Sequence, residues 1–187
     1  MGQRSQIYVK CEIGGKPHLT ARYFQWNYGD LMISRARYTI EWLITYSEYL
    51  KNSIKKLPKI MDVNFDYKDV TDSSCDIIKE YEEYISESYS VNELSFKDFV
   101  FHEDNNDGKL FIIVMPDGTI KYCFTDSDMD TPLTAEEYMS SQDWYWSSAK
   151  EDHMDEICRE NIEAINSTAE MMTADELFGF INTNYSR

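Results

Sequence analysis

The longest helical pattern in the chain runs from Asp30 to Leu57, and it limits which folds the chain can adopt. Apolar residues recur within it in steps of three and four, the spacing of one buried helix face. They are Ile33, Ala36, Ile40, Leu43, Tyr46 or Ser47, Leu50, Ile54 and Leu57. A helix over residues 30–57 would be about 42 Å long at 1.5 Å per residue. Asp30 suits its start and Pro58 its end. We therefore expect a scaffold helix that docks the preceding strands onto the rest of the chain.

Strand patterns stand on either side of this helix and group into two hairpins. Gly14 and Gly15 supply positive-φ positions for the first turn, and Asp117-Gly118 has the composition of a tight hairpin turn. The strands are expected at Ser5–Ile13, His18–Trp26, Phe99–His102, Lys109–Met115 and Thr119–Thr125. Together they predict one antiparallel sheet of four or five strands. The pattern leaves open whether the N-terminal hairpin joins that sheet.

Shorter helices are expected in the second half of the chain. The sequences Thr134–Glu137 and Thr173–Glu176 are both capping boxes, in which Thr and Glu satisfy backbone N–H groups at a helix start. Amphipathic patterns cover Ser74–Ser88, Ser147–Met172 and Ala174–Asn182, the last burying Leu177, Phe178 and Ile181. We predict a single α+β domain over residues 1–187, in which antiparallel β-hairpins form a four- to five-stranded sheet packed against one long and several shorter helices.

Charge is distributed unevenly along the chain. The whole sequence has 18 Lys and Arg against 34 Asp and Glu, a net charge of −16. Residues 1–59 have 10 basic and 4 acidic residues, a net of +6, so residues 60–187 carry −22. This asymmetry outlines two sub-units, a hairpin with the long helix (1–59) and an acidic α+β part (60–187). An acidic surface repels nucleic acid and attracts basic proteins. We therefore expect a basic protein surface as partner and no direct nucleic-acid binding.

Two acidic helix faces contain the candidate partner-binding residues. On the pattern Ser74–Ser88 they are Glu80, Glu82, Glu83 and Glu87. On the pattern Ser147–Met172 they are Glu151, Asp152, Asp155 and Glu156, and the same polar face continues through Glu160 and Glu163. A charge run on an amphipathic helix is usually a solvated face. That alternative stays open for both.

The densest carboxylate cluster, DSDMDTPLTAEE, occupies residues 126–137. Asp126, Asp128, Asp130 and Glu137 fall at positions 1, 3, 5 and 12 of a calcium-binding loop. Thr131 replaces the glycine that such a loop requires at position 6, and a strand pattern precedes the cluster where a helix is usual. A divalent-metal site therefore competes with a simpler interpretation, in which the Thr134 capping box opens a helix and the aspartates are solvated. No other cofactor is predicted.

The sequence lacks the motifs that are typical of several other classes of function. The four cysteines form no CxxC pair, so neither a disulfide framework nor a zinc site is expected. No apolar run reaches the roughly 20 residues of a membrane span, and the N-terminus lacks the apolar core of a signal peptide. We therefore expect a cytosolic protein without a membrane partner. The chain has no P-loop, GxGxxG, nucleophile elbow or HExxH motif, which favours binding over catalysis. Arg35 and Arg37 form a close basic pair, either solvated or salt-bridged, or contacting phosphate or a partner.

One resemblance adds to this description. The segments RSQIYV (residues 4–9) and LTARYFQWNYGDLMISRARYTIEWL (residues 19–43) resemble the start of small acidic proteins encoded by phages and mobile elements of Firmicutes. Type II-A anti-CRISPR proteins, which inhibit the RNA-guided effector nuclease, come from that gene pool. The similarity covers about the first quarter of the chain and includes no catalytic or binding motif. It therefore implies a class of protein, acting in the host bacterial cytosol, and assigns no residue.

The resemblance and the charge agree on one leading hypothesis. CRISPR effectors hold nucleic acids in positively charged channels and read the PAM with arginines. Carboxylates could occupy such sites as a DNA mimic, so we expect an anti-CRISPR protein that binds the effector, with or without guide RNA, and blocks DNA engagement. One alternative is a metal-dependent nuclease or hydrolase that uses Asp126, Asp128 and Asp130. Another is a phage accessory protein that binds a different host factor.

Overall fold

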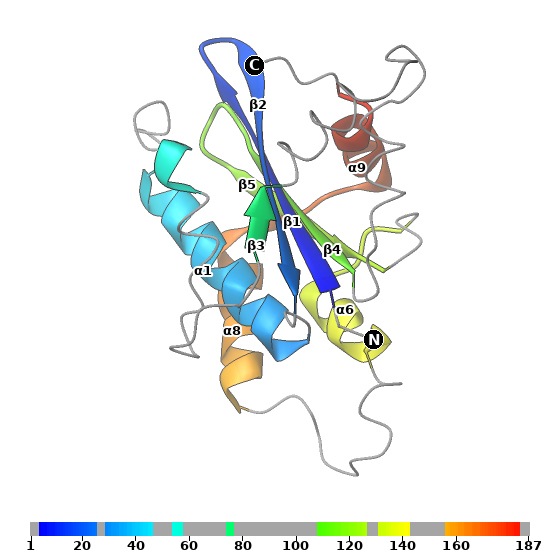
Figure 1. Ribbon diagram of the computed structural model, residues 1–187. Coiled ribbons are helices and arrows are strands. Elements are labelled where there is room, and N and C mark those ends of the chain that lie inside the picture. Colours follow the sequence, from blue (N-terminus) through cyan, green and yellow to red (C-terminus); the bar gives the residue numbers. More distant parts are fainter. Residues whose placement is uncertain are drawn as a thin grey trace.

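A computed structural model describes residues 4–25, 29–46, 54–57, 74–76, 108–126, 131–142 and 156–183 (Figure 1). Within these ranges, six strands form one mixed sheet in the order β3-β2-β1-β4-β5-β6. The strands are β1 (Arg4–Ile13), β2 (Lys16–Gln25), β3 (Ser74–Asp76), β4 (Lys109–Val114), β5 (Ile120–Thr125) and β6 (Glu170–Met171). The described helices are α1 (Asp30–Tyr46), α6 (Ala135–Ser141), α8 (Glu156–Thr168) and α9 (Ala174–Ile181). The predicted α+β class is confirmed.

Both predicted hairpins form, and they join in a single sheet. β1 pairs with β2, and β4 with β5, in antiparallel register. Gly118, with φ of 89°, occupies the second turn, where a side chain would strain the backbone. The two hairpins meet through β1 and β4, which run parallel, with Ile7 opposite Leu110. The sheet is therefore mixed, where the sequence predicts an antiparallel one. Turn residues identify hairpin partners, but a parallel pair is joined by a long crossover that leaves no local signal.

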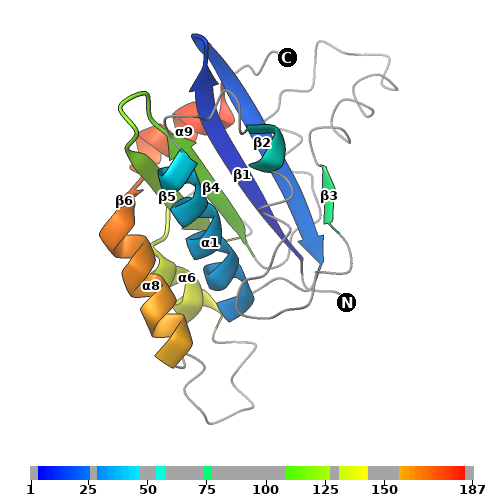
Figure 2. The ribbon, with the colours of Figure 1, turned by 90° about the vertical axis from the view of Figure 1, so that its left-hand side faces the viewer.

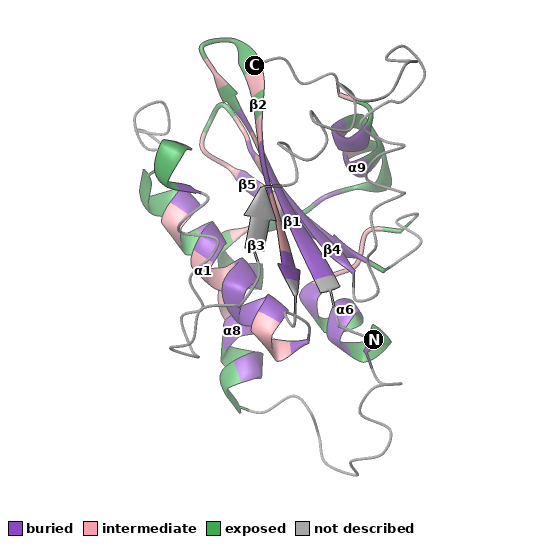
Figure 3. Cartoon of the chain, in the orientation of Figure 1, coloured by how far each residue is buried: buried purple, intermediate pink, exposed green. Residues whose placement is uncertain are grey.

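The sheet separates two hydrophobic cores. α1 and α8 lie side by side on one face, and α9 covers the other (Figures 1 and 2). Strand alternation sends Ile7, Val9 and Cys11 to the first face and Tyr8 to the second. Both faces of the central strands are therefore buried, and Figure 3 shows β1 and β4 almost wholly so in their middle parts.

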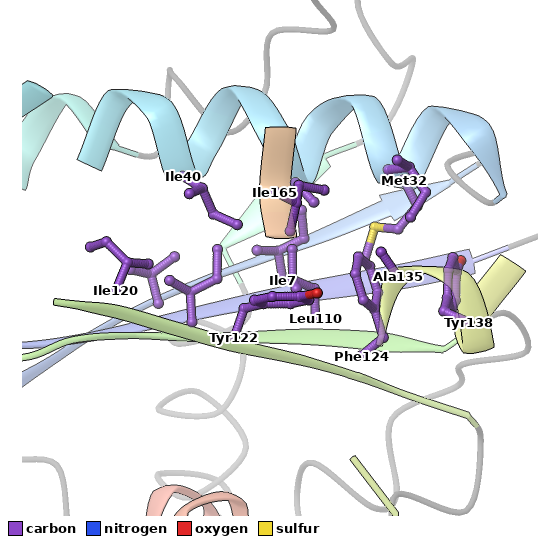
Figure 4. Close-up of a cluster of buried hydrophobic side chains, with 14 of the residues drawn as sticks. Ile7, Met32, Ile40, Leu110, Ile120, Tyr122, Phe124, Ala135, Tyr138 and Ile165 are labelled. Atoms are coloured by element: carbon purple, nitrogen blue, oxygen red, sulfur yellow. The ribbon is translucent and has the colours of Figure 1, made fainter. Parts of the chain in front are cut away.

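The predicted apolar stripe of α1 is confirmed over the described range. Ile33, Ala36, Ile40 and Leu43 are completely buried. Figure 4 shows Ile40 and Met32 pointing from α1 toward side chains of the sheet, with Ile165 of α8 beside them. Burying a side chain of this size contributes about 1.5–3 kcal/mol. α1 is thus held by packing along its length, as expected of a scaffold helix.

Two helices are shorter than the sequence predicts. The α-helix described from Asp30 ends at Tyr46, and residues 47–53 lie outside the described ranges. Ile54–Lys56 is a 3-10 turn rather than the end of an α-helix to Leu57. α8 ends at Thr168 rather than Met172, because Glu170–Met171 pairs with β5 as strand β6. Hydrogen bonding to the sheet outweighs the continuing helical periodicity there.

The start of a third predicted helix is wrong. The pattern from Ser74 predicts a helix, whereas Ser74–Asp76 forms β3 and pairs with Arg22–Phe24 of β2. The rest of that pattern, and the strand predicted at Phe99–His102, lie outside the described residues. A three-residue strand is too short to produce an alternation that competes with a longer amphipathic pattern.

The last predicted helix is confirmed, except that Phe180 and not Phe178 belongs to its buried face. α9 begins after the N-cap Thr173, whose capping box with Glu176 is complete. Leu177 and Ile181 are buried as predicted, but Phe178 is 62% exposed and Phe180 is buried instead. Residues 177, 180 and 181 share one helix face, and position 178 points away from it. No described helix is both long and apolar enough to cross a membrane.

Candidate partner-binding surface

Helix α8 presents a row of carboxylates opposite its buried face. The buried residues are Cys158, Asn161, Ile162 and Ile165. Glu156, Glu160 and Glu163 are exposed, and their spacing of four and three residues aligns them on the outer side. We call these three residues the acidic stripe. Arg159, also exposed, is the single basic residue of α8, so the helix has a net charge of −2.

The acidic stripe has small and opposing effects on the stability of α8, since Glu156 lies in the first turn, where a carboxylate is favourable. Like charges four residues apart, as at Glu156 and Glu160, destabilise a helix by about 0.2–0.5 kcal/mol. The buried side of α8 already supplies its packing against α1. The acidic stripe is therefore either a solvated face, which is the usual role of such a charge run, or a surface for a partner.

Helix α6 adds one carboxylate, that of Glu136, next to α8. Thr134 and Glu137 form the predicted capping box, since the Thr134 side chain accepts from the Glu137 N–H and the Glu137 carboxylate accepts from the Thr134 N–H. The side-chain amide of Asn166 on α8 donates to the Glu136 carboxylate at 2.8 Å. Its oxygen accepts from the hydroxyl of Tyr122 at 2.6 Å. Burial raises the pKa of Tyr122 to about 12, so this hydroxyl remains a donor. These bonds fix Glu136 beside α8.

The predicted metal loop is described in part. Glu137 is committed to the capping box, the simpler of the two interpretations of this segment. Asp126 is exposed at the end of β5, and Asp128 and Asp130 lie outside the described residues. Among described residues, no three His, Cys, Asp or Glu side chains are grouped as a metal site would require. The metal site stays a prediction.

One of the eight carboxylates predicted to bind a partner can be placed. Glu156 is exposed at the start of α8 and belongs to the acidic stripe. The other seven lie outside the described residues: Glu80, Glu82, Glu83, Glu87, Glu151, Asp152 and Asp155. The described surface therefore includes only one residue of the predicted binding faces.

Arg35 and Arg37 have different environments although they are two residues apart. Arg35 is completely buried, with its guanidinium carbon 4.3 Å from the ring centroid of Phe24. Such a side chain cannot contact a partner at the surface. Arg37 is partly exposed and donates to Glu41 at 2.8 Å and to Asn161 of α8 at 2.7 Å. Arg37 therefore fits the salt-bridged alternative predicted from the sequence. Its hydrogen bond to Asn161 connects α1 to α8.

A cavity of about 560 Å³ lies on the other side of the sheet, between α9 and the ends of β1 and β4. Ile113 and Phe180 line it, and Lys10 lies over the Phe180 ring while donating to the Thr183 hydroxyl at 2.9 Å. Burial lowers the pKa of Lys10. Glu176 at its edge accepts from Lys121 at 2.6 Å, a bond that lowers the pKa of Glu176 and raises that of Lys121. These charged groups brace α9 against the sheet.

The sequence indicates part of this surface. The helical spacing of Glu156, Glu160 and Glu163 can be read directly from the order of residues. The position of Glu136 beside α8 cannot, because it depends on a contact between residues 30 positions apart along the chain. Comparisons of the chain with protein-family models, curated proteins and solved structures find no match.

Proposed function

We propose that this protein is a non-catalytic inhibitor that binds a basic protein surface through the acidic stripe of α8. The partner we propose is a type II RNA-guided effector nuclease, in the anti-CRISPR manner, within the bacterial cytosol. The observation that carries this proposal is the exposed row Glu156, Glu160 and Glu163, with Glu136 held at Asn166 of the same helix.

The spacing of the stripe suits a mimic of a nucleic-acid backbone. Successive carboxylates are three or four residues apart, about 4.5–6 Å along the helix axis. A rigid helix therefore offers regularly spaced negative charge without the flexibility of a loop. Charge-assisted hydrogen bonds from Arg and Lys to carboxylates resemble those to phosphate. A channel that evolved to hold nucleic acid would accept such a surface and lose access to DNA.

The net charge also favours this function kinetically. Residues 60–187 carry −22, which accelerates encounter with a positively charged partner. Attraction of this kind is screened by salt, since the Debye length falls from about 30 Å at 0.01 M to about 3 Å at 1 M ionic strength. Binding should therefore weaken steeply as the salt concentration rises.

A binding measurement with matched charge reversals tests the proposal. The purified protein is titrated against the effector, with and without guide RNA, at low and high salt. Glu160→Lys should weaken binding about tenfold, equivalent to about 1.4 kcal/mol. Glu12→Lys, an exposed reversal of the same size on β1, should change affinity less than about twofold. Equal losses of affinity for both variants would mean that the net charge of the protein, and not the position of the carboxylates on α8, determines binding. Absence of binding to the effector, with capture of another host protein instead, would favour the accessory-protein alternative.

A further inference from the structure

The C-terminal end of α8 opens onto a cavity of about 460 Å³. Its walls are Asn166–Glu170, the turn residues Gly118–Ile120, and Ile44 of α1. In Figure 2 these three parts of the chain meet on the left-hand side, where α8 leads into β6. Ile44 is 39% exposed and supplies an apolar wall. This cavity is distinct from the acidic stripe but lies on the same helix.

The stripe leads directly to this cavity. Residue 167 follows Glu163 by four positions, so Ser167 stands in the same row as Glu156, Glu160 and Glu163. Ser167 is also one of the lining residues. A basic partner lying along the stripe would therefore reach the cavity at the end of the row.

The polar groups of the cavity are arranged to accept hydrogen bonds. The hydroxyls of Ser167 and Thr168 both donate back to the Ala164 carbonyl, at 3.0 and 2.6 Å. Each hydroxyl has one proton, so their oxygen lone pairs remain as acceptors. The Ile165 carbonyl accepts from the Ala169 N–H at 2.9 Å. The carbonyls after it stand at the negative end of the helix dipole, where the helix supplies no further N–H. The last turn of α8, Ile165–Thr168, contains no basic residue to offset it.

Negative charge at the cavity comes from Glu170. Its side chain is 68% exposed, and its carboxylate is 3.9 Å from the Lys121 ammonium. Lys121 makes its hydrogen bond to Glu176 instead, at 2.6 Å. Glu170 is the one charged residue among the described residues lining the cavity. Asp117, next to the turn wall, has its pKa lowered chiefly by the hydrogen bond from the Thr119 backbone N–H, so it too is anionic at neutral pH.

We propose that this cavity binds an arginine side chain of the partner, as the anchor at the end of the acidic stripe. A guanidinium has five N–H donors and no acceptor, which matches a site composed of hydroxyl, carbonyl and carboxylate oxygens. Its apolar stem packs against Ile44. Arginine is also enriched among the residues that dominate binding energy at interfaces. This inference rests on the proposed function for its partner, but the site itself can be tested without one.

The test uses small probes and amide chemical shifts of the full chain. N-acetyl-arginine amide should produce saturable shifts at residues 118–120 and 166–170. N-acetyl-citrulline amide, which has the same shape without the charge, should produce none there. N-acetyl-lysine amide should bind more weakly than the arginine probe, because it lacks the planar fork.

Substitutions in the cavity and in the acidic stripe test where the arginine probe binds. Glu170→Gln should weaken binding of the arginine probe about fivefold, whereas Glu163→Gln, which removes the same charge from the stripe, should change it less than about twofold. Ile44→Arg, at an exposed position, should place a guanidinium in the cavity and abolish the shifts. Similar responses to the arginine and citrulline probes, or equal effects of the two Gln variants, would overturn the proposal.

These outcomes are separable from those of the proposed function. If the stripe reversal weakens effector binding but the arginine probe does not bind, the cavity proposal fails and the proposed function stands. If the probe binds the cavity while Glu160→Lys leaves effector affinity unchanged, the site stands and the proposed function fails.

Discussion

Helices α1 and α8 lie side by side on the same face of the sheet but differ in how much of each is buried. α1 buries eight of its 17 residues, including an arginine, whereas α8 buries four of its 13. α1 belongs to the basic part of the chain and α8 to the acidic part. The contact between them includes the bond from Arg37 to Asn161. The pair shows that burial, more than charge content, decides which helix is available to a partner.

The difference implies that substitutions on α1 should affect stability and those on the outer side of α8 should affect binding. The largest effect is expected at Arg35, the largest fully buried side chain of those described. Arg35→Ala should lower the free energy of unfolding by about 4 kcal/mol, because it opens a cavity and leaves the groups around the lost cation without their partner. Urea denaturation followed by circular dichroism measures this loss.

Arg37→Ala is the control for that substitution. Arg37 is partly exposed, so loss of its ion pair with Glu41 should cost no more than about 1 kcal/mol, and loss of its hydrogen bond to Asn161 should add about 1 kcal/mol. Arg35→Met retains most of the volume and removes the charge, and it should recover much of the stability lost in Arg35→Ala. Similar losses for Arg35→Ala and Arg37→Ala would contradict the contrast drawn between buried and exposed arginine.

A second comparison uses isoleucines, one on each helix. Ile40 of α1 is completely buried, and Ile157 of α8 is 55% exposed. Ile40→Ala should destabilise the protein by about 3 kcal/mol through lost transfer energy and the cavity left behind. Ile157→Ala should change stability by less than about 0.5 kcal/mol. Thermal unfolding of both variants measures these stability losses. A large loss for Ile157→Ala would mean that Ile157 is held by packing and is not free to contact a partner.

Much of this contrast could be predicted from the sequence. The strand β1 and both capping boxes depend on neighbours within a few residues and are found where predicted, as is the stripe of α1 over its described range. Arg35 shows where such prediction stops. A solvated or salt-bridged arginine is the usual expectation, but the approach of Phe24 from β2 makes the site a buried one.

The edge strands of the sheet could not be predicted either, because they too depend on contacts between residues distant in the sequence. β3 and β6 have three and two residues, and each exists because a longer strand offers it hydrogen bonds. Local periodicity carries no information about such pairing. The cavity at the end of α8 likewise requires α1, the β4–β5 turn and α8 to converge, which no single segment predicts.

The smallest predicted effect concerns the capping box at the start of α6, the helix that places Glu136 beside α8. Thr134→Ala removes the acceptor for the Glu137 N–H and should cost about 1 kcal/mol of stability. Thr134→Ser keeps that acceptor and should stay within a few tenths of a kcal/mol. Hydrogen exchange at the Glu137 amide should accelerate in the Ala variant alone, because that N–H then loses its bond. If α6 serves to hold the Glu136 carboxylate beside α8, effector binding should weaken in parallel with this local opening. Accelerated exchange with unchanged affinity would instead confine the binding surface to α8.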